Sequence, residues 1–316
     1  MNFETMIQTS ADYADHADTC RYDPANQLKL FTGPGLRDIS KSLRLSAKSA
    51  VPNAVSRIKR LGWLAGLLLI GSLPVAGAPV DGDRVFVCGH SFHFFIGQPL
   101  EALAHEAGHA GHKTAGTLVL GSSRVIDIWN LPDAKNTAKA ALQTGGVDVL
   151  TLSPHKVLPD PGIDLYADLA VKYNPNAHVF VQFSWSQAMM EKPDTAYWRK
   201  LGADYAARLQ KQVEEINARQ GRATVSIVPV APAVLALWDL VEAGKVPGVD
   251  KVGSLFVDNA LHPSPVLKNL IAYCWFASIY KQSPVGLKAL DGQVPAATNR
   301  ILEQLAWETV TGFAKG

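Results

Sequence analysis

Three residues that together can perform nucleophilic catalysis lie near the two ends of the C-terminal three quarters of the chain. Ser91 follows VFVCG, a segment with the composition of a buried strand. A serine at the carboxyl end of a strand can present its hydroxyl to a substrate, beside backbone N–H groups that can stabilise an oxyanion. Asp258 and His262 lie in one loop ahead of an apolar helix, where a carboxylate can hold an imidazole in one tautomer. Each half alone fits a helix cap or a solvated loop equally well; together they predict a catalytic triad.

A second motif, HEAGH, comprises His105, Glu106 and His109 and matches the zinc-binding pattern of metalloproteases. On a helix, histidines four residues apart share one face and the glutamate can act as general base. The glycine-rich continuation AGHAGHKTAG predicts instead that the helix ends at about Gly108, and the third histidine of the longer signature is absent. The motif is therefore interpreted as a helix-terminal histidine cluster, and a zinc metalloprotease ranks third among the functional hypotheses. We expect no metal and no cofactor.

The composition restricts the class of partner. The 316 residues are 47% hydrophobic and 18% charged, with a formal net charge of +2. Proteins that bind nucleic acids or anionic membranes usually concentrate basic residues on one face, which a nearly balanced chain does not favour. We therefore expect no nucleic-acid partner, and a small molecule or a polymer bound at a local cleft.

The segment 56–78 has the three parts of a secretory signal peptide. A basic cluster precedes a short apolar run, and the segment closes on Ala76-Gly77-Ala78. An uncleaved membrane anchor and a buried helix remain as alternatives, although a spanning helix needs roughly 18 to 20 apolar residues. Residues 1–55 show no periodic pattern and are interpreted as an extension without folded structure, or as a reading frame that starts too early. We expect a secreted or periplasmic domain of residues 79–316, outside the membrane after cleavage.

This domain alternates regularly between strand-like and helix-like segments. Continuous apolar runs, typical of strands buried on both faces, occur at 84–89, 116–121, 147–153, 177–185 and 223–230. Helical patterns lie between and after them, at 98–109, 133–143, 163–173, 195–219, 233–243 and in the apolar stretch that starts at 269. The alternation predicts an α/β domain with a parallel five-stranded sheet in a three-layer α/β/α sandwich. Functional sites of such domains lie at the carboxyl ends of the strands.

The order of the three chemical residues resembles that of the SGNH (GDSL-type) hydrolases. Members of this superfamily have the nucleophilic serine after the first strand and an Asp and a His in one loop before the last long helix. The resemblance covers 79–316 and implies a flavodoxin-like SGNH hydrolase fold and carboxylic ester hydrolysis at Ser91, Asp258 and His262. The α/β-hydrolases share the order but carry G-x-S-x-G around the serine, which is absent here.

Three motifs depart from the family pattern. GDS is GHS here, so His90 replaces the aspartate, and Asp258 lies four residues before His262 instead of three. The resemblance implies that N–H groups of Ser91 and Gly121 form the oxyanion hole, with Ser122 nearby. The family's Gly-x-Asn-Asp block is replaced by LTLSPH, so Ser153, or less favourably His155, must supply the donor that the Asn normally gives.

Residues at other strand ends are candidates for substrate contacts. The candidates are His90, His155, Gln182 and Trp185. Aromatic and amide surfaces of the kind that bind sugars are offered by Trp129, Gln182, Trp185 and Trp198, although a Trp at a strand end is more often packed inside. Export and the family resemblance favour acyl, and especially acetyl, esters of carbohydrates or other small esters as substrates. A non-catalytic carbohydrate-binding descendant of the fold remains the second hypothesis, because of the altered motifs.

The cysteines offer one further structural question. Cys88 and Cys274 both lie in apolar runs and are expected to be small buried residues. Export would permit a disulfide between them, and the sequence leaves this possibility open.

Overall fold

The computed structural model describes residues 83–292 and 294–314. The predicted extension 1–55 and the predicted signal peptide 56–78 lie outside these residues. Within the described part of the chain, no helix is both long and apolar enough to cross a membrane.

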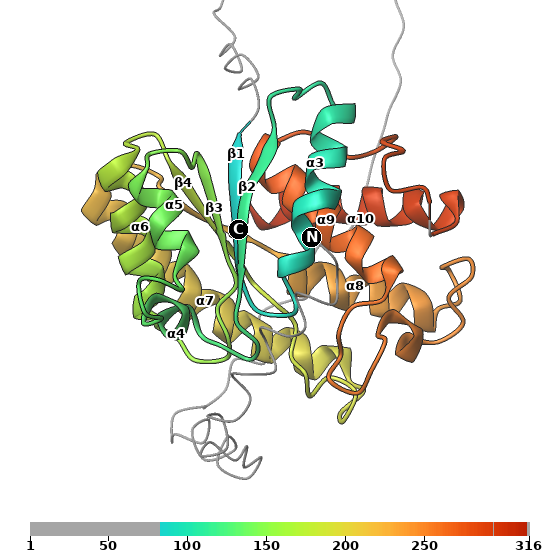
Figure 1. Ribbon diagram of the computed structural model, residues 1–316. Coiled ribbons are helices and arrows are strands. Elements are labelled where there is room, and N and C mark those ends of the chain that lie inside the picture. The colour runs from blue at the N-terminus through green and yellow to red at the C-terminus, as the bar shows by residue number, and fades with distance from the viewer. Residues whose placement is uncertain (1–82, 293, 315–316) are drawn as a thin grey trace, which may run out of the picture. The chain divides into compact units, whose positions relative to one another are not determined.

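The centre of the domain is a sheet of five parallel strands (Figure 1). The strands are β1 (Arg84–Gly89), β2 (Lys113–Val119), β3 (Val149–Leu152), β4 (His178–Gln182) and β5 (Val225–Val228). Their order is β2-β1-β3-β4-β5, which is the flavodoxin-like order. The predicted α/β class and parallel sheet are confirmed. β2 starts earlier than predicted, because its polar first residues pair with β1 although they are partly exposed at the sheet edge.

Helices cover both faces of the sheet (Figure 1). Four helices contribute to the hydrophobic core on one face: α3 (Gly97–Glu106), α8 (Val230–Glu242), α9 (Pro265–Tyr280) and α10 (Ala296–Phe313). The opposite core includes residues of α4 (Val125–Trp129), α5 (Thr137–Gln143), α6 (Pro161–Tyr173) and α7 (Thr195–Gln220). Two short 3-10 helices, η2 (Phe94–Ile96) and η3 (Val252–Leu255), complete the described elements. The sequence patterns predict neither α4 nor α10.

Local sequence explains where the two longest predicted helices begin and end. α7 starts after Asp194, whose side chain accepts a hydrogen bond from the Tyr197 N–H, and it ends at Gly221 with a φ of 69°. α9 starts with Pro265 in its first turn and buries ten of its residues.

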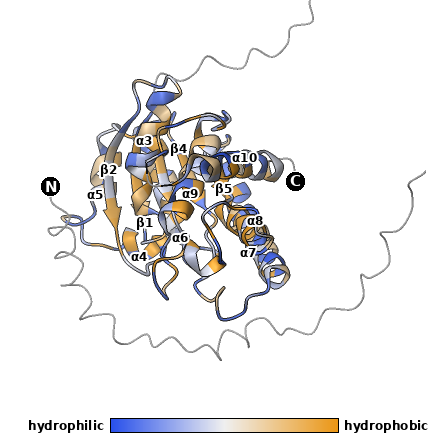
Figure 2. Cartoon of the chain, turned by 90° about the vertical axis from the view of Figure 1, so that its right-hand side faces the viewer, coloured by the Kyte–Doolittle hydropathy of each residue, from blue (hydrophilic) through white to orange (hydrophobic). Residues whose placement is uncertain are grey.

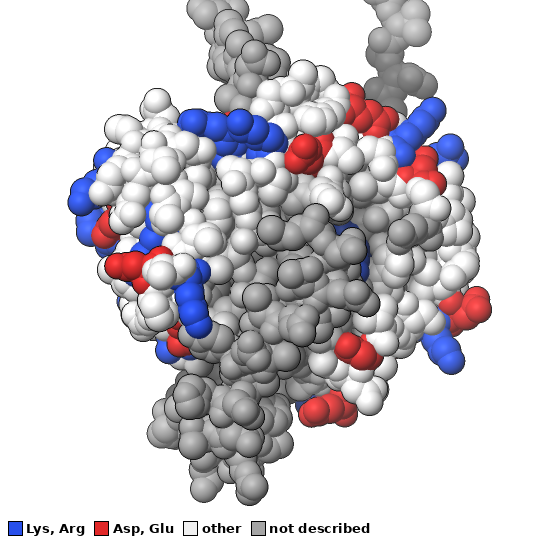
Figure 3. Space-filling model, viewed as in Figure 1, with Lys and Arg blue, Asp and Glu red and all other residues white. Residues whose placement is uncertain are grey.

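Hydrophobic residues concentrate on the strands and on the inner helix faces (Figure 2). Charges of both signs lie around the edge of the face that Figure 3 shows.

The two cysteines lie in different cores. Cys88 belongs to the core beneath α4–α7, whereas Cys274 belongs to the core beneath α3 and α8–α10. Both are buried and free. A disulfide between them is therefore not formed.

A close approach of α6 to α4 depends on Gly162. The Asp160 carboxylate accepts hydrogen bonds from the N–H groups of Val125 (2.8 Å), Ile126 (3.0 Å) and Gly162 (3.0 Å), which joins the two helix starts. A Cβ at position 162 would lie 2.3 Å from the backbone N of Ile126 and 2.4 Å from the carbonyl carbon of Val125. Only glycine fits there without a backbone shift.

Gly162→Ala is therefore expected to lower the free energy of unfolding by about 3 kcal/mol, since backbone atoms must move to accommodate the methyl group. Urea denaturation followed by circular dichroism measures this effect. Gly312→Ala is the control, because a Cβ there meets no atom within 4 Å. Equal stability of the two variants would show that α4 and α6 separate at little cost.

Candidate functional site

The candidate site lies at the carboxyl edge of the sheet, around the end of β1. β1 pairs with β2 on one side and with β3 on the other. The chain therefore goes from β1 to one neighbour and then crosses to the opposite side of β1, so the strand order reverses at β1. Open parallel sheets bind ligands at such a switch point. Ser91 follows β1 and Ser153 follows β3. The loop before α9 carries Asp258 and His262.

Ser91 occupies a tight turn between β1 and η2. The turn is closed by a hydrogen bond from the His93 N–H to the His90 carbonyl (3.0 Å). Gly89 is required before it, because a Cβ there would lie 2.9 Å from the His93 ring and 3.0 Å from the Ser153 Cβ. Ser91 is partly exposed, and its hydroxyl makes no hydrogen bond to another described residue. It is thus open to a substrate.

Asp258 and His262 form an oriented pair. Nδ1 of His262 lies 2.6 Å from Oδ2 of Asp258, and the His262 backbone N–H donates to Oδ1 (3.1 Å). This hydrogen bond from the ring lowers the pKa of the Asp258 carboxyl. The carboxylate therefore holds the proton on Nδ1 and leaves Nε2 as the basic nitrogen.

The loop conformation makes the four-residue spacing possible. The Val257 N–H donates to the His262 carbonyl (2.9 Å), and Leu261 adopts a φ of 60°, so the chain turns back on itself between acid and histidine. The predicted contact between Asp258 and His262 is present. The Asn259 side chain makes no hydrogen bond to another described residue and lines a neighbouring cavity instead. The catalytic roles of Asp258 and His262 stay predictions.

Phe92 connects the serine turn to the histidine loop. Its ring stands edge-on to His262, with ring centroids 5.7 Å apart, and stacks on Trp185 at 4.4 Å. The Trp185 indole N–H donates to the Leu261 carbonyl (3.3 Å). No hydrogen bond joins Ser91 to His262 within the described residues, but such contacts are often long before substrate binds. Trp185 is 5% exposed and packs inside the protein, and its predicted role as a substrate contact stays a prediction.

His90 also lies inside the protein. It is 3% exposed, and its Nδ1 accepts a hydrogen bond from the Phe92 N–H (3.3 Å). Nε2 therefore carries the proton and donates to Oγ of Ser153 at 2.9 Å. Burial lowers the pKa of His90 to about 4, so the ring is neutral at neutral pH. The predicted substrate contact of His90 stays a prediction; in the structure, its hydrogen bond to Ser153 joins the β1 loop to the β3 loop.

The Gln182 side chain donates a hydrogen bond to the turn that carries Ser91. Its side chain is fully buried; Oε1 accepts from the Trp275 indole N–H (2.8 Å), and Nε2 donates to the Phe92 carbonyl (3.1 Å) and to Ser184 Oγ (2.8 Å). All of these partners lie inside the protein, and the predicted substrate contact of Gln182 stays a prediction. Its role here is to hold the residue that follows the serine.

His93 and Thr151 belong to the same buried polar network, and the sequence patterns did not predict them as members. Nε2 of His93 lies 2.7 Å from the Thr151 hydroxyl, and its Nδ1 lies 3.2 Å from Oε1 of Gln182. Burial lowers the pKa of His93 to about 3, so it too is neutral. A signal was available, because Thr151 and Gln182 interrupt apolar strands and a buried polar side chain must find partners.

The oxyanion candidates differ in their accessibility. Gly121 and Ser122 are exposed in the loop after β2, where Ser122 has a φ of 50°. Ser153 is fully buried between His90 and Ser184, whose Oγ lies 3.3 Å from its own. The expectation that Ser153 reaches an oxyanion is therefore not supported.

His155 is better placed to face a substrate. Its ring is perpendicular to that of His90 at a centroid distance of 5.7 Å, the residue is partly exposed, and its ring nitrogens have no hydrogen-bond partner among the described residues. Burial lowers its pKa to about 4. A neutral imidazole there retains one N–H that can be donated.

The HEAGH side chains do not converge on a metal position. α3 ends at Glu106, so His109 lies beyond the helix. The Glu106 carboxylate accepts hydrogen bonds from the backbone N–H groups of Lys288 (2.8 Å) and Ala289 (2.6 Å). His109 stacks on Tyr280 with centroids 3.9 Å apart. Within the described ranges, no three His, Cys, Asp or Glu side chains are grouped as metal ligands.

Comparisons with known proteins give likeness of structure only. No family model matches the chain, and no curated protein matches it in sequence. A DUF4886 family protein from Bacteroides uniformis is similar over 73% of this chain and 95% of its own, with 12% identity and a TM-score of 0.49. A protein described as "a putative SGNH hydrolase" from Slackia heliotrinireducens is similar over 62% of this chain and 97% of its own, with 17% identity and a TM-score of 0.39. At these values the likeness does not bear on activity.

Proposed function

We propose that the chain is a serine ester hydrolase of SGNH type that works through an acyl-serine intermediate. The observation that carries the proposal is the Asp258–His262 pair, hydrogen bonded at 2.6 Å, whose imidazole packs on Phe92, the residue after the partly exposed Ser91. A nucleophile, a base and an orienting acid are the parts that acyl transfer to water requires.

The reaction proceeds in two balanced steps. His262 Nε2 takes the Ser91 proton as Oγ attacks the ester carbonyl, and the resulting imidazolium returns the proton to the departing alcohol. Water then attacks the acyl-serine with His262 again as base, which releases the acid and restores Ser91. Asp258 stabilises the imidazolium in both steps because its carboxylate stays ionised beside Nδ1.

The oxyanion that forms in each step needs donors on the open side of Ser91. The backbone N–H groups of Ser91 and Gly121 are assigned this role, with Ser122 beside them. His155 takes the position of the missing Asn donor, because it is partly exposed whereas Ser153 is closed to solvent. Its depressed pKa keeps it an uncharged donor above pH 5 or so.

The proposed substrates are acyl esters, above all acetyl esters, of carbohydrates or other small alcohols. The predicted signal peptide supports a secreted or periplasmic location, where polysaccharide esters are available. The near-balanced net charge of +2 supports neither a nucleic-acid partner nor a charged membrane surface.

Labelling with a serine-directed fluorophosphonate tests the proposal. We expect one covalent adduct, located at Ser91 by peptide mass spectrometry, together with hydrolysis of p-nitrophenyl acetate that is insensitive to a chelator. A folded protein that is neither labelled nor active would favour the non-catalytic carbohydrate-binding alternative. Activity that is lost to a chelator and restored by zinc would overturn the serine assignment.

A further inference from the structure

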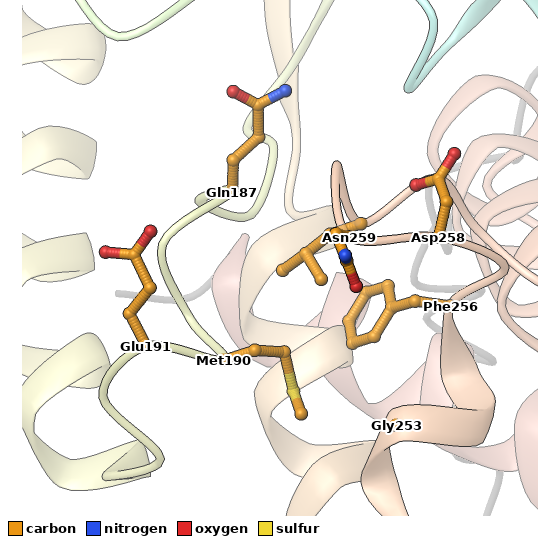
Figure 4. A pocket seen from close by; sticks show the side chains of 8 residues that line it. Gln187, Met190, Glu191, Gly253, Phe256, Asp258 and Asn259 are labelled. Carbon is orange, nitrogen blue, oxygen red and sulfur yellow. The ribbon is translucent and has the colours of Figure 1, made fainter. Parts of the chain in front are cut away.

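A cavity of about 360 Å³ lies beside the Asp258–His262 loop. One wall is the loop after β4, with Gln187, Met190 and Glu191, and the other runs from η3 to the residue before His262 (Figure 4). Both walls belong to the carboxyl edge that carries Ser91. The Trp185 indole, which donates to the Leu261 carbonyl, fixes the second wall to the stacked Phe92. Through Trp185 and Phe92, the wall that contains Leu261 is thus packed against the turn that carries Ser91.

Three polar side chains of the cavity make no side-chain hydrogen bond to another described residue. They are Gln187 and Glu191 on one wall and Asn259 on the other (Figure 4), and the charge of Glu191 also interacts with that of Lys156. Asp258 also lines the cavity, but its carboxylate points away from Phe256 and is held by His262. Two amides and one carboxylate therefore remain for a ligand, and together they favour one that carries several hydroxyl groups.

The remaining lining is apolar, and none of the described lining residues is basic. Met190, Phe256 and Leu261 provide the apolar surface, beside Gly253. An apolar chain would cover the free amides and the carboxylate without replacing their hydrogen bonds to water. An anionic ligand would be repelled by Glu191 and Asp258. The volume is near the lower end of ligand pockets, roughly 300 to 1,000 Å³, so one small ring fits better than a long ligand.

We propose that this cavity binds the sugar ring of the ester substrate. The amides of Gln187 and Asn259 and the Glu191 carboxylate bind its hydroxyl groups, while Phe256 and Met190 contact its C–H face. The inference rests on the proposed esterase function, because it assigns the alcohol part of the ester that Ser91 attacks.

Filling the cavity from Gly253 provides the test. A Cβ at this glycine meets no atom within 4 Å, and its backbone is not in the left-handed region, so Gly253→Leu places a side chain in open space at the cavity wall. Gly312→Leu is the matched control, since it is an exposed glycine with equal room, on α10. Gln187→Ala and Glu191→Ala remove single hydrogen-bonding groups.

The measurement compares kcat/KM for a mono-acetylated methyl pyranoside with kcat/KM for p-nitrophenyl acetate, which has no sugar ring. We expect Gly253→Leu to lower the ratio of the two values by at least about tenfold, mainly through KM, and each alanine variant to lower it by roughly three- to tenfold. Gly312→Leu is expected to leave the ratio as in the wild type. An unchanged ratio in all three cavity variants overturns the proposal.

Two further outcomes separate this inference from the proposed function. A selective loss of p-nitrophenyl octanoate hydrolysis in Gly253→Leu, with the sugar ester unaffected, would assign the cavity to an acyl chain and overturn the proposal. If the wild type cleaves no ester, calorimetric titration with the unacetylated methyl pyranoside still tests whether the cavity binds a sugar. Binding that is lost in Gly253→Leu supports a sugar site in a non-catalytic protein, and no binding overturns it.

Discussion

Ser91→Ala is expected to lower kcat for p-nitrophenyl acetate by roughly 10⁴ to 10⁶, the scale seen when a triad serine is removed from a serine hydrolase. The reason is chemical: without the hydroxyl no acyl-enzyme forms, and only water activated by His262 can attack the carbonyl. The oxyanion donors remain and account for residual rate above that of the uncatalysed reaction. Steady-state kinetics on purified protein measure the effect.

Ser283→Ala provides the matched control for this prediction. Ser283 is exposed after α9, at the end of that helix away from the histidine loop, and its hydroxyl only accepts a hydrogen bond from the Val285 N–H (3.2 Å). Its loss should leave kcat within about twofold of the wild type, as expected for a surface change that touches no site residue. If Ser91→Ala retained most of the activity, the hydrolysis would have to come from another nucleophile or from a metal-bound water.

Asp258→Asn is expected to lower kcat for the same ester by roughly 10² to 10⁴, with the triad aspartate of serine proteases as the guide. The amide can still accept from Nδ1, but it brings no negative charge to stabilise the imidazolium, and its NH₂ group can favour the wrong tautomer. Because Asp258 is nearly half exposed, with 46% of its side chain accessible, water can replace part of the lost stabilisation. The lower half of the range is therefore favoured.

Asn259→Ala distinguishes this assignment from the spacing usual in the resembling family, in which the acid lies three residues before the histidine. The Asn259 side chain makes no hydrogen bond to His262 or to another described residue and lines the cavity, so its removal should lower kcat for p-nitrophenyl acetate less than tenfold. Circular dichroism establishes that both variants fold. If Asn259→Ala lost most of its kcat while Asp258→Asn kept a nearly wild-type kcat, His262 would take its orientation from position 259.

The histidine at position 90, where the SGNH hydrolases that the sequence resembles have an aspartate, has a structural explanation. A charged side chain at position 90 would be buried at 3% exposure, whereas the neutral imidazole satisfies both of its nitrogens, with the Phe92 N–H and the Ser153 hydroxyl. Ser153 accepts the hydrogen bond from His90, so two positions at which the sequence departs from the SGNH pattern are partners in one hydrogen bond between the β1 and β3 loops.

The sequence by itself determined the α/β class, the five strands and the position of Ser91 at a strand end. These features follow from local patterns: strands such as VFVCG are buried on both faces and read as continuous apolar runs, and parallel strands require helical crossovers. The contact between Asp258 and His262 was also predictable, since the two residues are only four positions apart in the chain. α4 was not predictable, because its five residues depend on hydrogen bonds to Asp160, more than thirty residues away.

Only the tertiary structure decided which polar residues are open to solvent. His90, Gln182 and His155 are all polar residues near strand ends, and the sequence cannot separate them. Burial and hydrogen bonding do: the first two are closed inside a network with Ser153 and Trp275, and the third is partly open. The cavity beside Asp258 likewise exists only because Gln187 and Asn259, far apart in the chain, are brought together by the packing of two loops. Such long-range juxtaposition depends on how whole elements pack, and no local pattern encodes it.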